Sequence, residues 1–129
     1  MLLDSQNLFC ENQEITSGTI YSQNVIAFGK NDVSFVPVLI QAVSDFSGLV
    51  DLEVKIETCA NKDFDEATEL ASSKLTLEKL KSGATFPIKF LPQGNLGFMR
   101  LAFVVNGTET TGKITSGVVA SNSLSYHEI

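Results

Sequence analysis

The sequence has no tryptophan, one histidine and one arginine, and each scarcity argues against a class of function. General-base and triad chemistry most often use a firmly held imidazole, whereas His127 lies close to the end of the sequence, where chains tend to fray. Nucleic-acid binding through phosphates needs clustered Lys and Arg, but 15 acidic residues outnumber 9 basic ones and give a net charge of −6. We therefore expect no enzyme and no nucleic-acid partner.

Cysteines and long apolar runs are also scarce. Cys10 and Cys59 are too few for a disulfide framework, and neither has a second Cys or a His at the spacing of a zinc site. We expect two free thiols, buried or half-buried, and no metal or cofactor. Asp4 interrupts the apolar start and no basic residue precedes Lys30, which is unlike an export signal. No apolar run approaches the roughly 20 residues of a membrane span, so we expect no membrane partner.

Alternation of apolar and polar residues is the clearest positive pattern in the chain. It is strict from Val50 to Thr58, and alternate side chains of a strand point to opposite faces, one dry and one wet. Further segments rich in Val, Ile, Phe and Thr are bounded by turn residues: 25–28, 34–43, 69–77, 85–91, 98–105 and 113–120. The pattern predicts a single all-β domain over residues 1–129, an antiparallel β-sandwich of jelly-roll type with about seven to eight strands.

Two short motifs suggest bound phosphate or metal, and each has a simpler interpretation. Gly107–Lys113 matches the first positions of a phosphate-binding loop, but Ile114 stands where a Ser or Thr is required, so we expect a hairpin between two strands. Asp63–Glu66 lies in an acidic stretch and lacks the glycine and the distant glutamate of a calcium loop. That segment is interpreted as a polar turn on a solvated face.

Four phenylalanines near one another in the sequence are candidates for a sugar-stacking platform: Phe86, Phe90, Phe98 and Phe103. Core packing is the favoured interpretation, because Phe is usually buried and the chain has no Trp to stack on a sugar.

The amino-terminal arm, residues 1–14, contains the candidate interface residues Leu2, Leu3, Leu8 and Phe9. An extended apolar segment can add a strand or a clip to a neighbouring protein. The alternative is that these side chains close the core of their own domain. Residues 121–129 form a polar tail to which no contact is assigned.

Several segments resemble a known family in the order in which they occur. Met1–Phe9, followed by acidic Glu11–Glu14, is similar to the amino terminus of the Bbp16-type capsid cement (decoration) proteins of tailed bacteriophages. Leu91–Gly94, Phe98–Phe103 and Gly112–Val119 resemble the closing strands and the glycine-punctuated hairpin of that family. The resemblance spans nearly the whole chain except the tail, and its motifs are structural.

The resemblance implies a structural jelly-roll protein that is made in the host bacterial cytoplasm and located on the outer surface of the virion capsid. Its partners would be the major capsid protein, whose neighbouring copies it bridges against the pressure of packaged DNA, and itself, as a homodimer or a trimer. It implies no catalytic residue and no cofactor. The alternatives are a carbohydrate- or ligand-binding jelly-roll module and a metal-dependent enzyme that uses Asp63 and Asp65.

Overall fold

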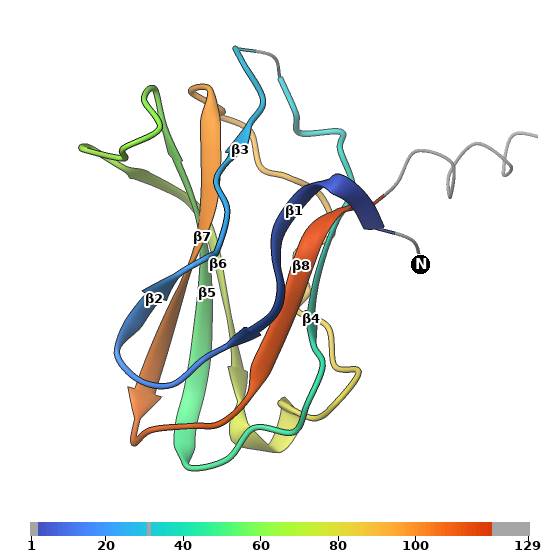
Figure 1. Cartoon of the computed structure of the whole chain (residues 1–129), viewed down its shortest axis with the longest axis vertical. Coiled ribbons are helices and arrows are strands. Elements are labelled where there is room, and N and C mark those ends of the chain that lie inside the picture. The colour runs from blue at the N-terminus through green and yellow to red at the C-terminus, as the bar shows by residue number, and fades with distance from the viewer. Residues whose placement is uncertain (1–2, 31, 120–129) are drawn as a thin grey trace, which may run out of the picture.

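The computed structural model describes residues 3–30 and 32–119 and is all-β, with two antiparallel sheets packed face to face (Figure 1). The first sheet has three strands in the order β1-β8-β4, and the second has five, in the order β2-β7-β5-β6 with β3 also pairing with β7. Their bounds are β1 Leu3–Glu14, β2 Thr19–Tyr21, β3 Ile26–Ala27, β4 Val38–Ala42, β5 Leu49–Cys59, β6 Thr68–Thr76, β7 Phe98–Gly107 and β8 Lys113–Val119, with one 3₁₀ turn, η1, at Leu77–Lys79. No α-helix occurs in the described ranges, and the all-β prediction is confirmed.

The inner faces of both sheets meet in one hydrophobic core. On β5 the alternate residues Leu52, Val54 and Ile56 are fully buried, as the sequence pattern predicts, but Val50, the first apolar residue of that pattern, is 66% exposed at a register shift between Leu49 and Asp51. The largest fully buried side chains are Phe9, Phe86 and Phe103, and burying a side chain of this size contributes roughly 1.5–3 kcal/mol. The core therefore joins β1, β7 and the segment before β7 into one packed unit.

The four phenylalanines do not share one environment. Phe86 and Phe103 are in the core, as expected, and Phe98 is half-buried. The expectation of core packing is wrong for Phe90, whose side chain is 57% exposed. This exposed ring is part of the site described below.

Residues 83–91, called the edge segment here, run beside β4 without forming a regular strand. The predicted strand at 85–91 is replaced by isolated bridges and separate hydrogen bonds to β4, such as the one from the Phe86 N–H to the Ile40 carbonyl at 2.9 Å. The bridges Gln41–Thr85 and Pro37–Phe90 span four steps on the β4 side and five steps on the edge segment, so one extra residue in the edge segment interrupts the ladder. The edge segment is nevertheless the outermost element on this side of the first sheet.

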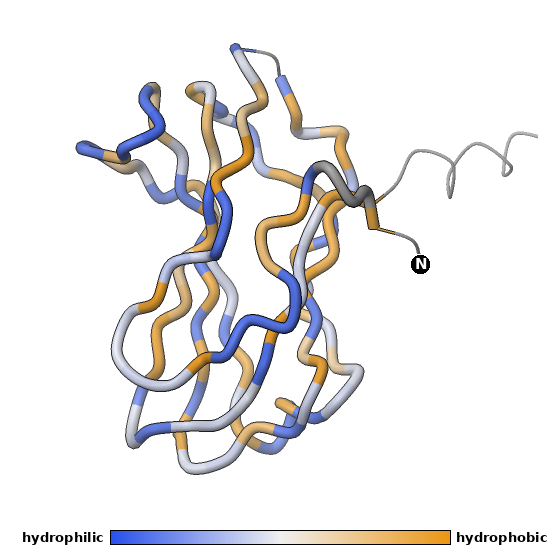
Figure 2. Tube along the Cα trace, in the orientation of Figure 1, coloured by the Kyte–Doolittle hydropathy of each residue, from blue (hydrophilic) through white to orange (hydrophobic). Residues whose placement is uncertain are grey.

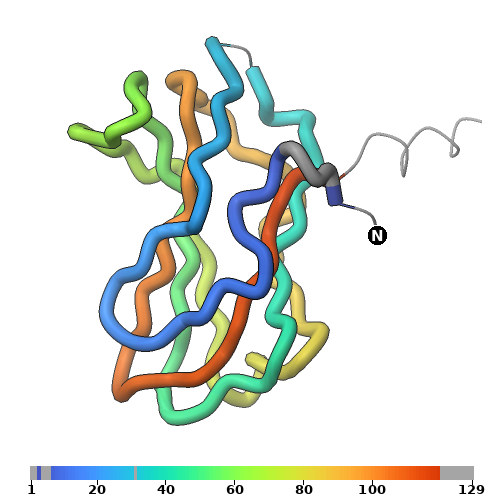
Figure 3. Tube along the Cα trace, in the orientation of Figure 1, coloured from blue at the N-terminus to red at the C-terminus, as the bar shows by residue number. Residues whose placement is uncertain are grey.

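The connection from β7 to β8 is not a hairpin, which corrects the prediction for Gly107–Lys113. β7 belongs to the second sheet and β8 to the first, so the loop crosses from one sheet to the other, as the trace in Figure 3 shows. Lys113 begins a strand, whereas a phosphate-binding loop leads into a helix.

The free edge of β1 is closed by separate hydrogen bonds, most of them from side chains, and not by a further strand. The Gln13 amide donates to the Tyr21 carbonyl at 2.8 Å and accepts from the Gln23 N–H at 2.9 Å. The Glu11 N–H donates to the Gln23 side chain at 3.0 Å. These bonds fasten the edge of the first sheet to the segment that follows β2 in the second.

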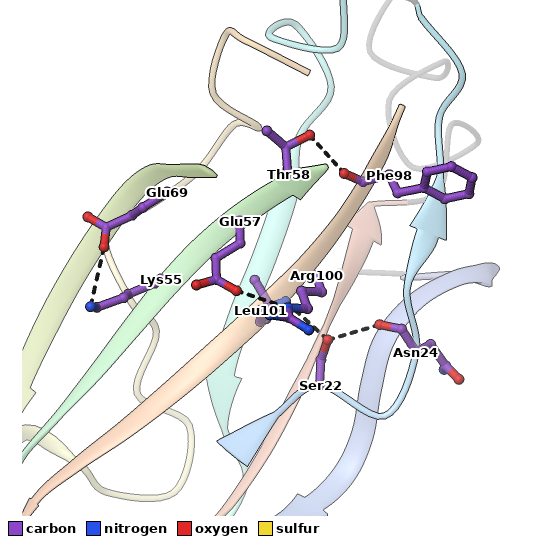
Figure 4. A network of polar contacts seen from close by, with 9 residues as sticks. All are labelled: Ser22, Asn24, Lys55, Glu57, Thr58, Glu69, Phe98, Arg100 and Leu101. Atoms are coloured by element: carbon purple, nitrogen blue, oxygen red, sulfur yellow. Dashed lines mark hydrogen bonds and ion pairs between the residues drawn. The ribbon is translucent and has the colours of Figure 1, made fainter. Parts of the chain in front are cut away.

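Arg100 on β7 is the central contact on the outer face of the second sheet (Figure 4). Its Nε donates to Glu57 Oε1 at 2.9 Å. Its guanidinium carbon lies 3.7 Å from the ring centroid of Tyr21 and 4.4 Å from that of Phe64. Arg100 therefore holds an edge strand and the β5–β6 turn against the middle of the sheet.

We expect Arg100→Ala to lower the free energy of unfolding by about 2 kcal/mol, because it removes a charge-assisted hydrogen bond and two ring contacts. Arg100→Lys should retain only part of this free energy, since an ammonium group lacks the planar surface that stacks on the rings. Lys55→Ala is the control, because its 3.3 Å ion pair with Glu69 is more exposed and is expected to contribute less to stability. Urea unfolding measures all three, and equal losses for Arg100→Ala and Lys55→Ala would contradict this role.

Candidate functional site

The outer faces of the two sheets differ in polarity. The second sheet presents charges: Glu53 of β5 lies opposite Lys74 of β6, and Glu57 lies opposite Arg100. On the first sheet, Leu39 of β4 lies between the inward-facing Val38 and Ile40, so its half-buried side chain points outward. Figure 2 shows the chain coloured as hydrophobic where β8 ends beside β4. The outer face of the first sheet is thus apolar around Leu39, whereas Gln41 of β4 and Thr115 of β8, which lie opposite each other, make it polar farther along.

Gly117 is the centre of that face. It lies opposite Leu39 on one side and Leu8 of β1 on the other. A Cβ atom at position 117 would lie 2.6 Å from Leu8 Cδ2 and 3.0 Å from the Asn7 carbonyl oxygen, so the glycine lets β1 and the Leu8 side chain approach closely. Leu8 therefore covers Gly117 from the outside, and Leu8, Gly117 and Leu39 form an apolar row across the sheet.

The apolar row continues into a groove between β4 and the edge segment. The groove has a volume of about 320 Å³ and is lined by Pro37, Val38, Leu39, Thr85, Phe86, Ile88, Lys89, Phe90 and Val119. Phe90 is exposed at this groove. Phe35 is 73% exposed and lies nearby in the fold, because the carbonyl of the next residue, Val36, accepts a hydrogen bond from the Leu91 N–H. The row and the groove together are called the docking face.

The candidate residues of the amino-terminal arm occupy different environments. Leu3 pairs with Val119 and is half-buried, and Leu8 belongs to the docking face. Phe9 is fully buried in the core, so it closes its own domain and is not part of the docking face. Leu2 lies outside the described residues, as do His127 and the polar tail 121–129.

The described residues show no arrangement suited to holding a metal ion. Within residues 3–30 and 32–119, no three or more His, Cys, Asp or Glu side chains gather closely enough for one. Asp63–Glu66 forms the expected polar turn, in which the Asp63 N–H donates to the Asn61 side chain at 3.1 Å. The same described residues contain no helix long and apolar enough to cross a membrane.

Both cysteines are free and buried, as predicted. The Cys10 thiol packs in the core and donates to the Ile114 carbonyl at 3.5 Å. Burial raises the pKa of Cys10 from its usual 9.0 to about 12, because a thiolate would be poorly solvated there. Cys10 is therefore held as a neutral thiol.

In a Cys59→Ser variant at pH 8, we expect iodoacetamide to alkylate folded Cys10 about a thousandfold more slowly than the urea-unfolded chain, because the thiolate is the reactive form and its fraction falls by about that factor. Below about pH 9 the thiol is protonated in both states, and above it the unfolded chain ionises first. This thiol should therefore lower the free energy of unfolding as pH rises from about 9 to about 12. Alkylation at the same rate in both states would contradict a buried, neutral Cys10.

Gly117→Ala tests the close approach of β1 to β8. We expect a loss of about 1–2 kcal/mol in the free energy of unfolding, because the new Cβ overlaps Leu8 Cδ2. Adding Leu8→Ala removes the overlapping atom, so the double variant should be about 1 kcal/mol more stable than the sum of the single losses predicts. Urea unfolding of the four proteins gives this coupling, and strictly additive losses would show that the two residues do not touch.

Neither the protein-family models nor the curated proteins compared with this chain give a match. A functional assignment therefore depends on the fold and on the docking face.

Proposed function

We propose that this chain is a structural capsid cement protein of a tailed bacteriophage. It binds the exterior of the head through the docking face, bridges neighbouring major capsid proteins and stabilises the shell against internal DNA pressure. The docking face, an apolar patch on the outside of the first sheet, is the observation that carries the proposal. A sheet of a free-standing sandwich normally presents polar residues outward, and an apolar face rimmed by polar residues marks an interaction site.

The order of the strands supports a jelly roll, the finer fold that the proposal requires. With the edge segment counted as a strand and β2 and β3 sharing one position, the chain has eight positions. The first position pairs with the eighth (β1 with β8) and the second with the seventh (β2 and β3 with β7). The third pairs with the sixth (β4 with the edge segment) and the fourth with the fifth (β5 with β6). In a jelly roll, a long ribbon made of these four antiparallel pairs is folded over. The first and third pairs then lie in one sheet, and the second and fourth pairs lie in the other. Jelly rolls of this kind are common in viral capsid proteins, although a fold alone does not establish a function.

The two outer faces suggest how the molecule is oriented on a shell. The charged face of the second sheet suits contact with water, while the apolar docking face on the first sheet suits burial against a protein. Burying modest contacts in many copies can stabilise a large assembly without any single strong interface. In this proposal the protein is made in the host cytoplasm and acts on the outer capsid surface as a homodimer or a trimer.

A carbohydrate-binding jelly roll is the second candidate, favoured by the exposed ring of Phe90 beside the groove. An exposed aromatic ring can stack on a sugar. A glycan array separates the two candidates, since a capsid cement protein needs no glycan for shell binding.

The proposal is tested by mixing the purified protein with expanded shells of the encoding phage that lack it. We expect stoichiometric binding in a sedimentation assay and a higher shell disruption temperature. Phe90→Ser should weaken binding about tenfold or more, because an exposed aromatic ring is buried at the interface. Val50→Ser is the matched control, since Val50 is 66% exposed at the start of β5 in the other sheet.

Absence of binding to these shells would overturn the proposed function. Equal binding by Phe90→Ser and Val50→Ser would instead show that the shell interface lies outside the docking face. A melting curve for each variant shows whether a loss of binding comes from unfolding.

A further inference from the structure

We infer that β6 is a dimer interface, which pairs antiparallel with β6 of a second copy of this chain about a two-fold axis at Ser72. This deepens the proposed function and rests on the self-association that it includes, for which it gives the contact surface. It also selects a dimer over a trimer. Two identical strand edges that pair about a two-fold axis satisfy each other and leave no edge for a third copy.

β6 is a regular strand whose outer edge is open. Within residues 3–30 and 32–119, β6 pairs only with β5, and no further backbone–backbone hydrogen bond reaches it. The other outer elements differ, because hydrogen bonds fasten the β1 edge to the segment after β2 and the ladder of the edge segment is interrupted. A nine-residue strand that directs alternate N–H and C=O groups to an open edge is a template for another strand.

The charges on and beside β6 fit a second copy in antiparallel orientation. Residues 62–69, at one end, include four acidic residues and one lysine, whereas residues 74–81, at the other end, include three lysines and one glutamate. All of these charged side chains are exposed. Antiparallel pairing of two identical strands places the acidic end of each beside the basic end of the other, and parallel pairing would place like charges together. The edge is therefore complementary to itself.

The register shift at Leu70 places Glu69 and Lys74 as a two-fold axis requires. Glu69 and Lys74 lie opposite residues 57 and 53 of β5, and Ser72 lies opposite residue 55, halfway between them along the ladder. All three point outward, since residues 52, 54 and 56 of β5 point into the core. An axis at Ser72 thus sets Glu69 of each copy opposite Lys74 of the other. In a strand without the shift, their separation would place them on opposite faces.

Glu69 and Lys74 are both able to take a partner from a second copy. The Glu69 carboxylate lies 3.3 Å from the Lys55 Nζ of the same molecule (Figure 4), but the Glu69 side chain is still 47% exposed. A carboxylate accepts from more than one donor. Lys74 is exposed and forms no ion pair within the described residues. Two Glu69–Lys74 pairs across the axis would therefore add to the contacts that each molecule already has.

Small side chains lie next to the proposed axis. Ser72 would meet Ser72 of the second copy on the outer face, and Ala71 would meet Ser73 on the inner face. Short side chains let two strands approach to the usual spacing of roughly 4.8 Å. Ala71, Ser73 and Leu75 face inward and are half-buried in one molecule, so the second copy would also cover side chains that one molecule leaves partly exposed.

Mixing two charge-reversal variants tests the antiparallel pairing by sedimentation equilibrium. We expect the wild-type protein to dimerise, and Lys74→Glu and Glu69→Lys each to self-associate about tenfold more weakly or worse, because each variant's own dimer has two like-charge contacts. An equimolar mixture of the two variants should regain wild-type association, since both contacts then join opposite charges. Lys89→Glu and Glu11→Lys make the same charge changes at exposed positions of the first sheet and should dimerise as the wild type does.

A disulfide locates the axis. In a Cys59→Ser background, Ser72→Cys should give a covalent dimer on a non-reducing gel after addition of oxidised glutathione, because the Cα atoms of opposed residues lie about 4.5–5.5 Å apart, within disulfide range. Lys74→Cys should give none, since its two copies lie on opposite sides of the axis. A mixture of Lys74→Cys and Glu69→Cys should again give a covalent dimer.

Three results would overturn the inference: a wild-type protein that is not a dimer at any concentration up to its solubility limit, a mixture of charge variants that associates no better than each variant alone, or equal crosslinking by Ser72→Cys and Lys74→Cys. A wild-type trimer belongs to the first of these. Melting curves identify any variant that fails to fold, and the cysteine variants keep the native charge of Glu69 and Lys74 at all but the substituted position.

These outcomes are separable from a failure of the proposed function, because dimerisation is measured without shells. If the dimer forms as expected but shells are not bound, the capsid role fails and the β6 interface stands. If shells are bound by a protein that shows no β6 dimer, the β6 interface fails and the capsid role stands.

Discussion

Burial of the inner faces of the two sheets against each other is the interaction on which the rest of the structure depends. Leu52, Val54 and Ile56 turn inward on β5, as Val38 and Ile40 do on β4. Since side chains alternate along a strand, fixing the inner face also fixes which residues face outward. A slip of one residue would bury the charges of β5 and expose its leucine, valine and isoleucine. The same packing that forms the core thus directs charges outward on the second sheet and places Leu39 on the outside of the first.

Sequence patterns predicted the elements whose periodicity is local. The strict alternation at 50–58 corresponds to β5, and the predicted segments at 69–77, 98–105 and 113–120 correspond to β6, β7 and β8. The supposed hairpin at Gly107–Lys113 failed, because whether two consecutive strands share a sheet depends on distant partners. The strand expected at 85–91 is interrupted by one extra residue that has no partner on the β4 side, and β2 has only three residues, too few to show a pattern.

The docking face was only partly predictable. Leu8 was identified by its apolar character, but the same reasoning included Phe9, which a strand directs into the core. The groove itself gives no sequence signal, because its lining comes from residues near 38, 88 and 119. Phe86 and Phe90 have the same residue type and lie close together in sequence, yet only the pairing of the edge segment with β4 buries one and exposes the other.

The central position of β8 in the first sheet has a kinetic consequence. β8 is the last described strand in the chain, and it lies between β1 and β4, which are translated much earlier. Contacts between residues so far apart in sequence form slowly, and Gly117 and Val119 reach the surface of the sheet only when β8 inserts. Until β8 inserts, the apolar row of Leu8, Gly117 and Leu39 is incomplete, and the groove lacks Val119 in its wall. Only molecules that have finished folding can therefore present this surface, so incomplete chains would be excluded from any assembly that recognises it.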